Sequence, residues 1–221
     1  MDVDERQVAV AAARIGQSYP SCGVQVRQGD VLCLPFEDDS FDAVWCSDTV
    51  RYLDDGQLSV ALGEFRRVLR PGGVLAVRER DPSLVMVRPG DPYLFLDYYR
   101  AVAAHVACTR HLLRSRELHR RLEGAGFTMV RQHTILIEHY APLSSDVVRY
   151  RGPAWSQAAR TALRLGLEPQ WKPFLDPDGE QNPLRAADGY ISEGCAGRGQ
   201  RRHALTPLPR LLPRITLTGV R

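Results

Sequence analysis

GDVLCLPFEDDSFDAVWCSDTVRYLDD, residues 29–55, and EFRRVLRPGGVLAVRE, residues 64–79, are the two stretches that decide the fold. Residues 41–46 form a short apolar run and predict a buried strand. Apolar residues recur at helical spacing over residues 58–69 and predict an amphipathic helix, which the Pro-Gly-Gly at 71–73 ends. Residues 74–77 predict a second buried strand. A strand, a helix and a strand joined by short connections indicate an α/β fold with a parallel sheet.

The pattern continues on both sides of these stretches. Asp4 and Gln7 have capping-box spacing and predict the start of a helix. Further predicted elements are strands at residues 23–28, 127–131, 134–139 and 214–220, helices at 92–113, 116–124 and 147–165, and a loop-rich segment at 171–197. We therefore expect a core domain over residues 1–140 and a helical, loop-rich C-terminal extension over residues 141–221, with a possible last strand.

Composition narrows the class of protein. The 221 residues are 44% hydrophobic, enough for a substantial core. No apolar run approaches the ~18 residues that span a bilayer, and the polar first residues do not resemble a secretory signal. We expect a cytoplasmic protein. The net charge of +3 gives little reason to expect a nucleic-acid partner. The five cysteines are scattered without C-x-x-C spacing, so no metal site is expected.

The order of motifs resembles a known family. A G-D-x-x-x-L-P-F turn at residue 29, S-F-D-x-V at residue 40 and R-V-L-R-P-G-G at residue 67 follow one another as in the class I methyltransferases. The likeness is greatest to the ubiquinone and menaquinone methyltransferase-like group, methyltransferase type 11. The resemblance implies a Rossmann-like parallel sheet. It also implies S-adenosylmethionine as the cofactor and methyl transfer to a small-molecule acceptor.

The resemblance assigns Asp30 and Val31 to the adenine of the cofactor. A strand that ends at Gly29 and Asp30 places a carboxylate at the carboxyl edge of the sheet, where ligands of open α/β folds bind. An ionised carboxylate only accepts hydrogen bonds and so suits the exocyclic amine, while the Val31 N–H suits a ring nitrogen. The alternative is that Asp30 only caps a turn.

The same resemblance assigns residues to two further parts of the cofactor, the ribose and the amino-acid end. Asp2 matches the acidic residue that binds both ribose hydroxyls, which places Val3 against the adenine; the alternative is a frayed terminal residue. Ser47 follows the strand at 41–46 and is assigned to the amino-acid end of the cofactor, whose ammonium Asp48 would attract. The alternative for both residues is a helix N-cap.

One family motif has no counterpart in the sequence. The first strand and its D-x-G-x-G-x-G loop would precede Met1, so we expect an N-terminally truncated core. A start assigned too far downstream, a relative that has lost the loop, and a replacement by another segment or a partner chain remain open. The alternative function is a catalytically impaired protein with a binding or regulatory role. The sequence identifies no general base, acceptor or oligomeric state.

Overall fold

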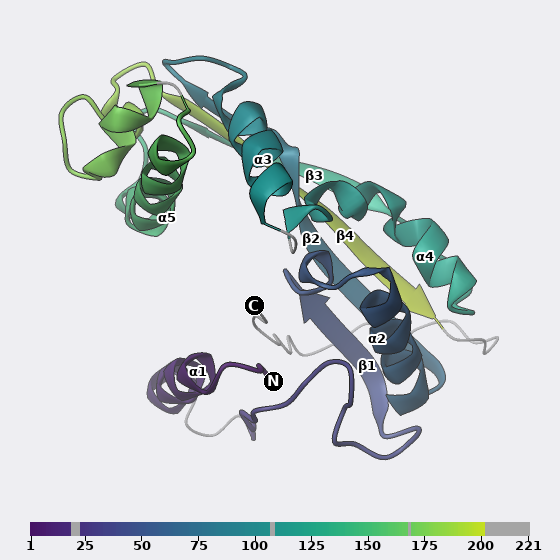
Figure 1. The fold of residues 1–221 in the computed structure, drawn as a ribbon. Coiled ribbons are helices and arrows are strands. Elements are labelled where there is room, and N and C mark those ends of the chain that lie inside the picture. The colour runs from purple at the N-terminus through teal and green to yellow at the C-terminus, as the bar shows by residue number, and fades with distance from the viewer. Residues whose placement is uncertain (19–22, 107–108, 168, 202–221) are drawn as a thin grey trace. The chain divides into compact units, whose positions relative to one another are not determined.

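The computed structural model describes residues 1–18, 23–106, 109–167 and 169–201. These residues form two compact units, each built from separate segments of the chain. Among the described residues, unit 1 contains residues 1–79, 114–133 and 196–201, and unit 2 contains residues 80–113 and 134–195, so the end of β4 belongs to unit 1. The sheet has the strand order β1-β2-β4-β3, so the last strand of the chain pairs between two earlier ones. Figure 1 shows the course of the chain through these elements.

Unit 1 begins with a helix and is organised around the first half of β2. Its elements are α1 Glu5–Ser18, β1 Phe41–Ser47, the short 3-10 helix η1 Val50–Tyr52, α2 Asp55–Val68, β2 from Leu69, the 3-10 helix η3 Leu112–Glu117 and α4 Leu118–Gly124. Helix α2 lies beside β1 and β2 (Figure 1). The predicted strands at 41–46 and 74–77 and the predicted helices at 58–69 and 116–124 are confirmed.

Strands β1 and β2 are parallel, as the apolar runs predict. Ala43 pairs with Val74, and the register continues to Ser47 opposite Arg78. The two strands therefore run in the same direction, and β1 ends at Ser47 beside the middle of β2. One buried cluster stabilises this arrangement, in which Val44 and Cys46 of β1, Leu75 of β2 and Phe65 of α2 take part. Burying a large apolar side chain stabilises the fold by ~1.5–3 kcal/mol, and the cluster contains 17 buried residues.

Helix α2 has a well-defined start. The Asp54 carboxylate accepts a hydrogen bond from the Gln57 N–H at 2.8 Å, and the Gln57 side chain accepts one from the Asp54 N–H at 3.0 Å. This reciprocal capping box satisfies two backbone donors that the helix itself leaves without partners. It fixes where the chain turns from the carboxyl edge of β1 into the helix.

Two predicted strands of the core are wrong. Residues 23–28 form only an isolated parallel bridge between Asp2 and Gln28, and residues 127–131 do not form a named strand. Alternation favours a strand, but a strand also needs a neighbouring backbone to complete its ladder of hydrogen bonds. Among the described residues, residues 23–28 have that neighbour at one position.

Strand β2 is much longer than its apolar run. It extends over Leu69–Arg88, starting before the Pro-Gly-Gly and running beyond Glu79. Buried and more exposed side chains alternate along β2, as expected for a strand. This alternation continues through charged residues, which the prediction from apolar runs alone did not include. Residues 80–88 extend the strand into unit 2.

Unit 2 has its own aromatic core. Its elements are the end of β2, α3 Leu94–His105, β3 His133–Tyr140, α5 Ser145–Arg164, the 3-10 helices η4 Pro169–Leu175 and η5 Pro183–Arg185, and β4 Tyr190–Arg201. The ring of Phe95 lies 5.1 Å from Trp155 and 5.0 Å from Trp171, and Phe174 completes the cluster. Residues 190–197 were expected to be loop and form part of β4, whereas the predicted strand at 134–139 is confirmed.

The predicted division of the chain at residue 140 stays a prediction. The compact units have other boundaries, because residues 80–113 pack with the later segments rather than with the N-terminal core. The expected last strand at 214–220 and most of the arginine-rich tail lie outside the described residues. No helix among the described ranges is long and apolar enough to cross a bilayer.

Candidate functional site

A cluster of charged side chains lies at the carboxyl end of β1, where Ser47 stands opposite Arg78 in the middle of β2. The Arg78 guanidinium donates to the Asp48 carboxylate at 2.6 Å and to the Ser47 hydroxyl at 3.1 Å. The Ser47 hydroxyl lies 3.2 Å from the same carboxylate. Asp48 has a positive φ of 53°, which turns the chain sharply at the end of β1. The register of the parallel pair, Ser47 opposite Arg78, brings these groups together.

Glu79 lies beneath this cluster. Leu75, Val77 and Glu79 occupy successive inward positions of β2, so the alternation of the strand buries a carboxylate that is only 1% exposed. Burial raises the pKa of Glu79 to about 7; the nearby Arg51 lowers it and the nearby Asp48 raises it further. The same burial, with Glu79 beside it, raises the pKa of the Cys46 thiol to about 12, so this cysteine is not a thiolate nucleophile at neutral pH.

Arg51 connects the cluster to η1. One nitrogen of its guanidinium lies 3.2 Å from the Asp48 carboxylate, and another donates to the Tyr52 hydroxyl at 2.8 Å. The guanidinium also stacks over the Tyr52 ring at 4.7 Å. Its Nε is buried and has no hydrogen-bond partner among the described residues, and the closest carboxylate oxygen, of Glu79, is 3.9 Å away. A buried donor without a partner indicates a position where a ligand acceptor fits.

A second group of polar atoms surrounds Asp2. The Asp2 N–H donates to the Arg27 carbonyl at 3.3 Å, and the Gly29 N–H donates to the Asp2 carbonyl at 2.9 Å. The Asp2 side chain is 5% exposed and accepts a hydrogen bond from the Asp4 N–H at 2.9 Å. Asp2 is thus held by backbone pairing and is not a frayed end. The pairing places it beside the segment that contains Asp30.

Asp30 and Val31 have different environments. Asp30 is exposed, and its Oδ1 accepts a hydrogen bond from the Leu32 N–H at 2.9 Å, so it does cap a turn. One oxygen of a carboxylate can serve this turn while the other accepts from a ligand. Val31 is 5% exposed and packs in the same buried cluster as β1, which anchors the turn to the sheet. The side chain of Val3 is 42% exposed, and its carbonyl accepts from Gln28 Nε2 at 3.0 Å.

The structure therefore gathers the five predicted site residues into two groups. Asp2, Val3, Asp30 and Val31 lie at the paired segments around the Asp2–Gln28 bridge, and Ser47 lies in the charged cluster at the carboxyl end of β1. Their roles toward a cofactor stay predictions. Ser47 does not cap η1 through its hydroxyl, because that hydroxyl faces Asp48 and Arg78.

The aromatic segment after β2 does not line a site as a whole. Phe95 is 2% exposed and packs in the core of unit 2, while Tyr93 is 65% exposed. Phe95 is thus a packing residue of an amphipathic helix. The 3.6-residue apolar period of the predicted helix at residues 92–113 indicates this packing role.

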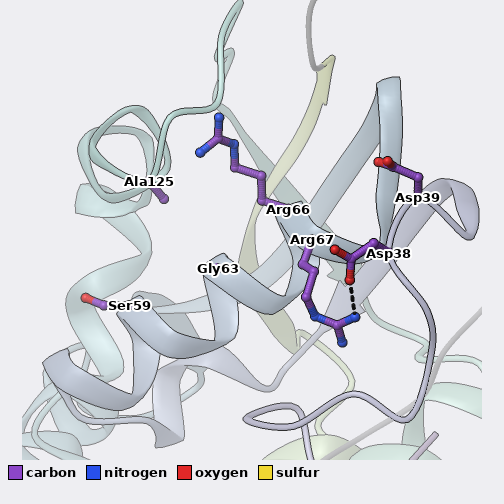
Figure 2. Close-up of a pocket in the computed structure, with 7 residues that line it drawn as sticks. All are labelled: Asp38, Asp39, Ser59, Gly63, Arg66, Arg67 and Ala125. Atoms are coloured by element: carbon purple, nitrogen blue, oxygen red, sulfur yellow. Dashed lines mark hydrogen bonds and ion pairs between the residues drawn. The ribbon is translucent and has the colours of Figure 1, made fainter.

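A separate pocket of about 390 Å³ lies in unit 1, lined by Asp38, Asp39, Ser59, Gly63, Arg66, Arg67 and Ala125. Figure 2 shows it between α2 and the loop before β1, with Arg67 paired to Asp38 at 2.8 Å. Asp38 and Asp39 precede β1, so the pocket lies toward the amino end of the strand. Ligands of parallel α/β sheets bind at the carboxyl ends, and we do not assign the active site to this pocket.

Two buried charged residues, Glu79 and Arg114, were not among the site residues predicted from the sequence. Both are charged and nearly fully buried, at 1% and 6% exposure. Glu79 continues the inward period of the apolar strand before it, which is a signal that the sequence contains. Arg114 lies in an irregular segment, and no local pattern distinguishes it from the exposed arginines around it. Its burial depends on tertiary packing.

Comparisons with known proteins agree with this architecture. Residues 1–77 match a family described as a methyltransferase domain. A demethylmenaquinone methyltransferase from Parafrankia sp. is 52% identical over 56 residues, which are 25% of this chain and 21% of that protein. The enzyme of the same name from Lactiplantibacillus plantarum is 28% identical over 142 residues, 59% of each protein. The chain spans about a third of the first three curated relatives that it matches, namely 35%, 27% and 32%.

A solved structure shows the same fold. A protein from Bacillus halodurans C-125, described as a candidate methyltransferase, superposes with a TM-score of 0.52 and covers 92% of this chain and 81% of its own. At 18% identity this likeness concerns the fold alone. Residues 1–77 thus match a methyltransferase domain, and the parallel pair β1–β2 and the shared fold agree with the class I methyltransferase resemblance seen in the sequence.

Proposed function

We propose that this protein transfers a methyl group from S-adenosylmethionine to a small-molecule acceptor. One observation carries the proposal. Within the residues that match the methyltransferase family, β1 ends at Ser47, and at this carboxyl edge a charged cluster forms with Arg78 of the parallel strand β2. That edge is where open α/β sheets bind nucleotide-containing ligands.

The group around Asp2 has the acceptors that an adenosine needs. Asp2 Oδ1 already accepts one backbone hydrogen bond, and a carboxylate has room for several more, so Asp2 can accept from ribose hydroxyls. Asp30 likewise uses one oxygen in its turn and can offer the other to an exocyclic amine. Val31 contributes its backbone N–H, and Val3 an exposed apolar side chain.

The charged cluster has both signs of charge, as the amino-acid end of the cofactor requires. Ser47 and Asp48 supply oxygens that suit an ammonium group. Arg51 has a buried Nε that lacks an acceptor among the described residues and therefore suits a carboxylate. The residues present thus fit the cofactor by the chemistry of their donors and acceptors.

S-adenosylmethionine, when bound, supplies an electrophilic methyl group on a sulfonium. The protein holds donor and acceptor in line and excludes water. A small organic acceptor is supported by the names of relatives, which include a demethylmenaquinone methyltransferase and a 2-phytyl-1,4-naphtoquinone methyltransferase.

Calorimetric titration of the chain with S-adenosylhomocysteine tests the proposal. We expect a micromolar dissociation constant, which corresponds to about −8 kcal/mol. Adenosine monophosphate serves as the control ligand, because it has the nucleoside but neither the thioether nor the amino acid. Absence of any S-adenosylhomocysteine binding at millimolar ligand would contradict the assignment.

A further inference from the structure

The start of η1 is held by a buried carboxyl group. Glu79 Oε1 accepts hydrogen bonds from the Thr49 N–H and the Val50 N–H, both at 2.8 Å. These two donors stand at the beginning of a helical turn, where backbone N–H groups have no partner within the helix. Both hydrogen bonds are buried, so they hold the turn without competition from water.

The end of η1 is held by a buried positive charge. The Arg114 guanidinium donates to the Val50 carbonyl at 3.3 Å and to the Leu53 carbonyl at 2.5 Å. A further nitrogen of Arg114 donates to the Asp55 carboxylate at 3.0 Å. These carbonyls are the acceptors that a helical end leaves without partners. The segment thus has a carboxylate at its start and a guanidinium at its end, which complements the polarity of aligned peptide dipoles.

Both charges are costly to bury. Desolvation lowers the pKa of Arg114 and raises that of Glu79. The charged groups near Glu79 are Arg51 on η1 and Asp48 in the preceding turn, and the Cys46 thiol of β1 also lies beside it. Glu79 Oε2 accepts no hydrogen bond among the described residues. Burying a carboxylate with one oxygen left without a hydrogen bond costs free energy. The two hydrogen bonds to the other oxygen therefore indicate a specific structural task.

That task concerns the turn that contains Ser47 and Asp48. The positive φ of Asp48 is unfavourable for a residue other than glycine and persists only where the surroundings impose it. The hydrogen bonds to Glu79 begin at the next residue, Thr49, and so fix the chain immediately after the strained position. They also fix Arg51, whose guanidinium contacts Asp48 from the other side.

We infer that Glu79 and Arg114 are positioning residues that hold η1 from both ends, so that Ser47, Asp48 and Arg51 receive the amino-acid end of the cofactor. This inference rests on the proposed function and names residues that the family match alone does not assign. Neither side chain needs to touch the cofactor, since Glu79 is 1% exposed and Arg114 is 6% exposed.

The test compares Glu79→Leu with Glu79→Gln. Leucine fills the space without accepting a hydrogen bond, while the glutamine oxygen can still accept from both N–H groups. Two ligands are titrated: S-adenosylhomocysteine, and 5′-methylthioadenosine, which lacks the amino-acid end. We expect Glu79→Leu to weaken S-adenosylhomocysteine binding at least tenfold and to leave 5′-methylthioadenosine binding within about threefold of wild type. Glu79→Gln keeps both affinities within about threefold.

Two matched controls complete the design. Glu123→Leu on α4 removes an exposed carboxylate of unit 1 and leaves both affinities unchanged. Arg114→Met releases the carbonyl end of η1 while filling the space, so it tests the same inference if Glu79→Leu does not fold. It is expected to reproduce the selective loss of S-adenosylhomocysteine affinity.

Equal losses for the two ligands in Glu79→Leu and Arg114→Met, or no loss in either variant, overturn the inference. If the wild-type protein binds neither ligand, the proposed function fails. Hydrogen exchange without ligand then decides the structural part alone. Faster exchange of the Thr49 and Val50 amides in Glu79→Leu, restored in Glu79→Gln, supports a clamp on η1, and unchanged exchange rejects it.

Discussion

At the scale of single residues, the candidate site depends on polar side chains that are buried, although burying a polar group costs free energy. Asp2 is 5% exposed and Glu79 is 1% exposed, although carboxylates are rarely so deeply buried. Asp2 was predicted from the family resemblance, because the run Met1-Asp2-Val3-Asp4 resembles the acidic end of the family's second strand. Glu79 was not, because a charge after an apolar run suggests that the strand has ended.

Asp30 is predicted to contribute to cofactor binding through its second carboxylate oxygen. Asp30→Asn keeps an oxygen for the Leu32 N–H but replaces the other oxygen with an NH₂ group, which cannot accept from an adenine amine. We expect S-adenosylhomocysteine affinity to fall about tenfold, or ~1.4 kcal/mol, with an unchanged unfolding midpoint. Calorimetric titration measures the affinity. Asp38→Asn in the pocket of Figure 2 serves as the control; an equal loss there would argue against a specific role for Asp30.

Glu79 is predicted to make stability depend on pH. Its pKa is raised from 4.5 to about 7 by burial, so the folded protein holds the proton more tightly than the unfolded chain does. Its contribution to stability is therefore fully present below pH 4.5 and is lost as pH rises through 7, by at most ~3 kcal/mol. Urea unfolding between pH 4.5 and 8 should show this loss in wild type relative to Glu79→Gln. A constant difference between the two proteins over that range would show that Glu79 does not titrate there.

At the scale of elements, the sequence predicts a helix or strand well where the residues that define it are neighbours in the chain. Helix α2 has an apolar period and a capping box within fourteen residues of sequence, and both are observed. Strand β2 was predicted only where it is apolar, because its extension over Leu69–Arg88 depends on pairing with other strands. Residues 23–28 show the opposite case. Their apolar and polar residues alternate as in a strand, but among the described residues they pair with a neighbouring segment only through one bridge.

Two substitutions on α2 should separate its buried and exposed faces. Leu62→Ala, at 2% exposure, removes methyl groups from the cluster against β1 and should cost ~2–5 kcal/mol. Val60→Ala, at 51% exposure on the same helix, should change stability by less than ~0.5 kcal/mol. Thermal unfolding of the two variants beside wild type measures the difference. Similar losses for both would mean that this face of α2 does not pack as described.

At the scale of the whole molecule, the chain alternates between two compact units. It passes from unit 1 to unit 2 within β2, returns at residue 114, passes again to unit 2 at residue 134, and returns to unit 1 at residue 196. The two buried clusters share no residue. Sequence composition does not reveal such alternation, since both units have similar mixtures of apolar and charged residues. A single division along the chain was the simplest expectation.

Separate cores should open separately. Phe174→Ala removes a ring from the cluster of unit 2 and should cost ~3–5 kcal/mol there. Hydrogen exchange measured by mass spectrometry should therefore accelerate in α5 and remain unchanged in α2. The exposed ring of Tyr150, also in unit 2, gives a control in Tyr150→Ala. Equal acceleration in α5 and α2 would indicate one cooperative unit.

The sequence by itself determined the class of fold, the parallel pair β1–β2 with α2 between them in the chain, and the resemblance to the family that residues 1–77 match. It could do so because apolar period, caps and glycine turns act over a few neighbouring residues. Only the tertiary structure decided that Asp2 pairs with Gln28, that Glu79 and Arg114 hold the two ends of η1, and that β2 continues into a second unit. Each of these depends on which backbone or charge lies opposite, and the distances between the partners along the chain are too large for local patterns to encode them.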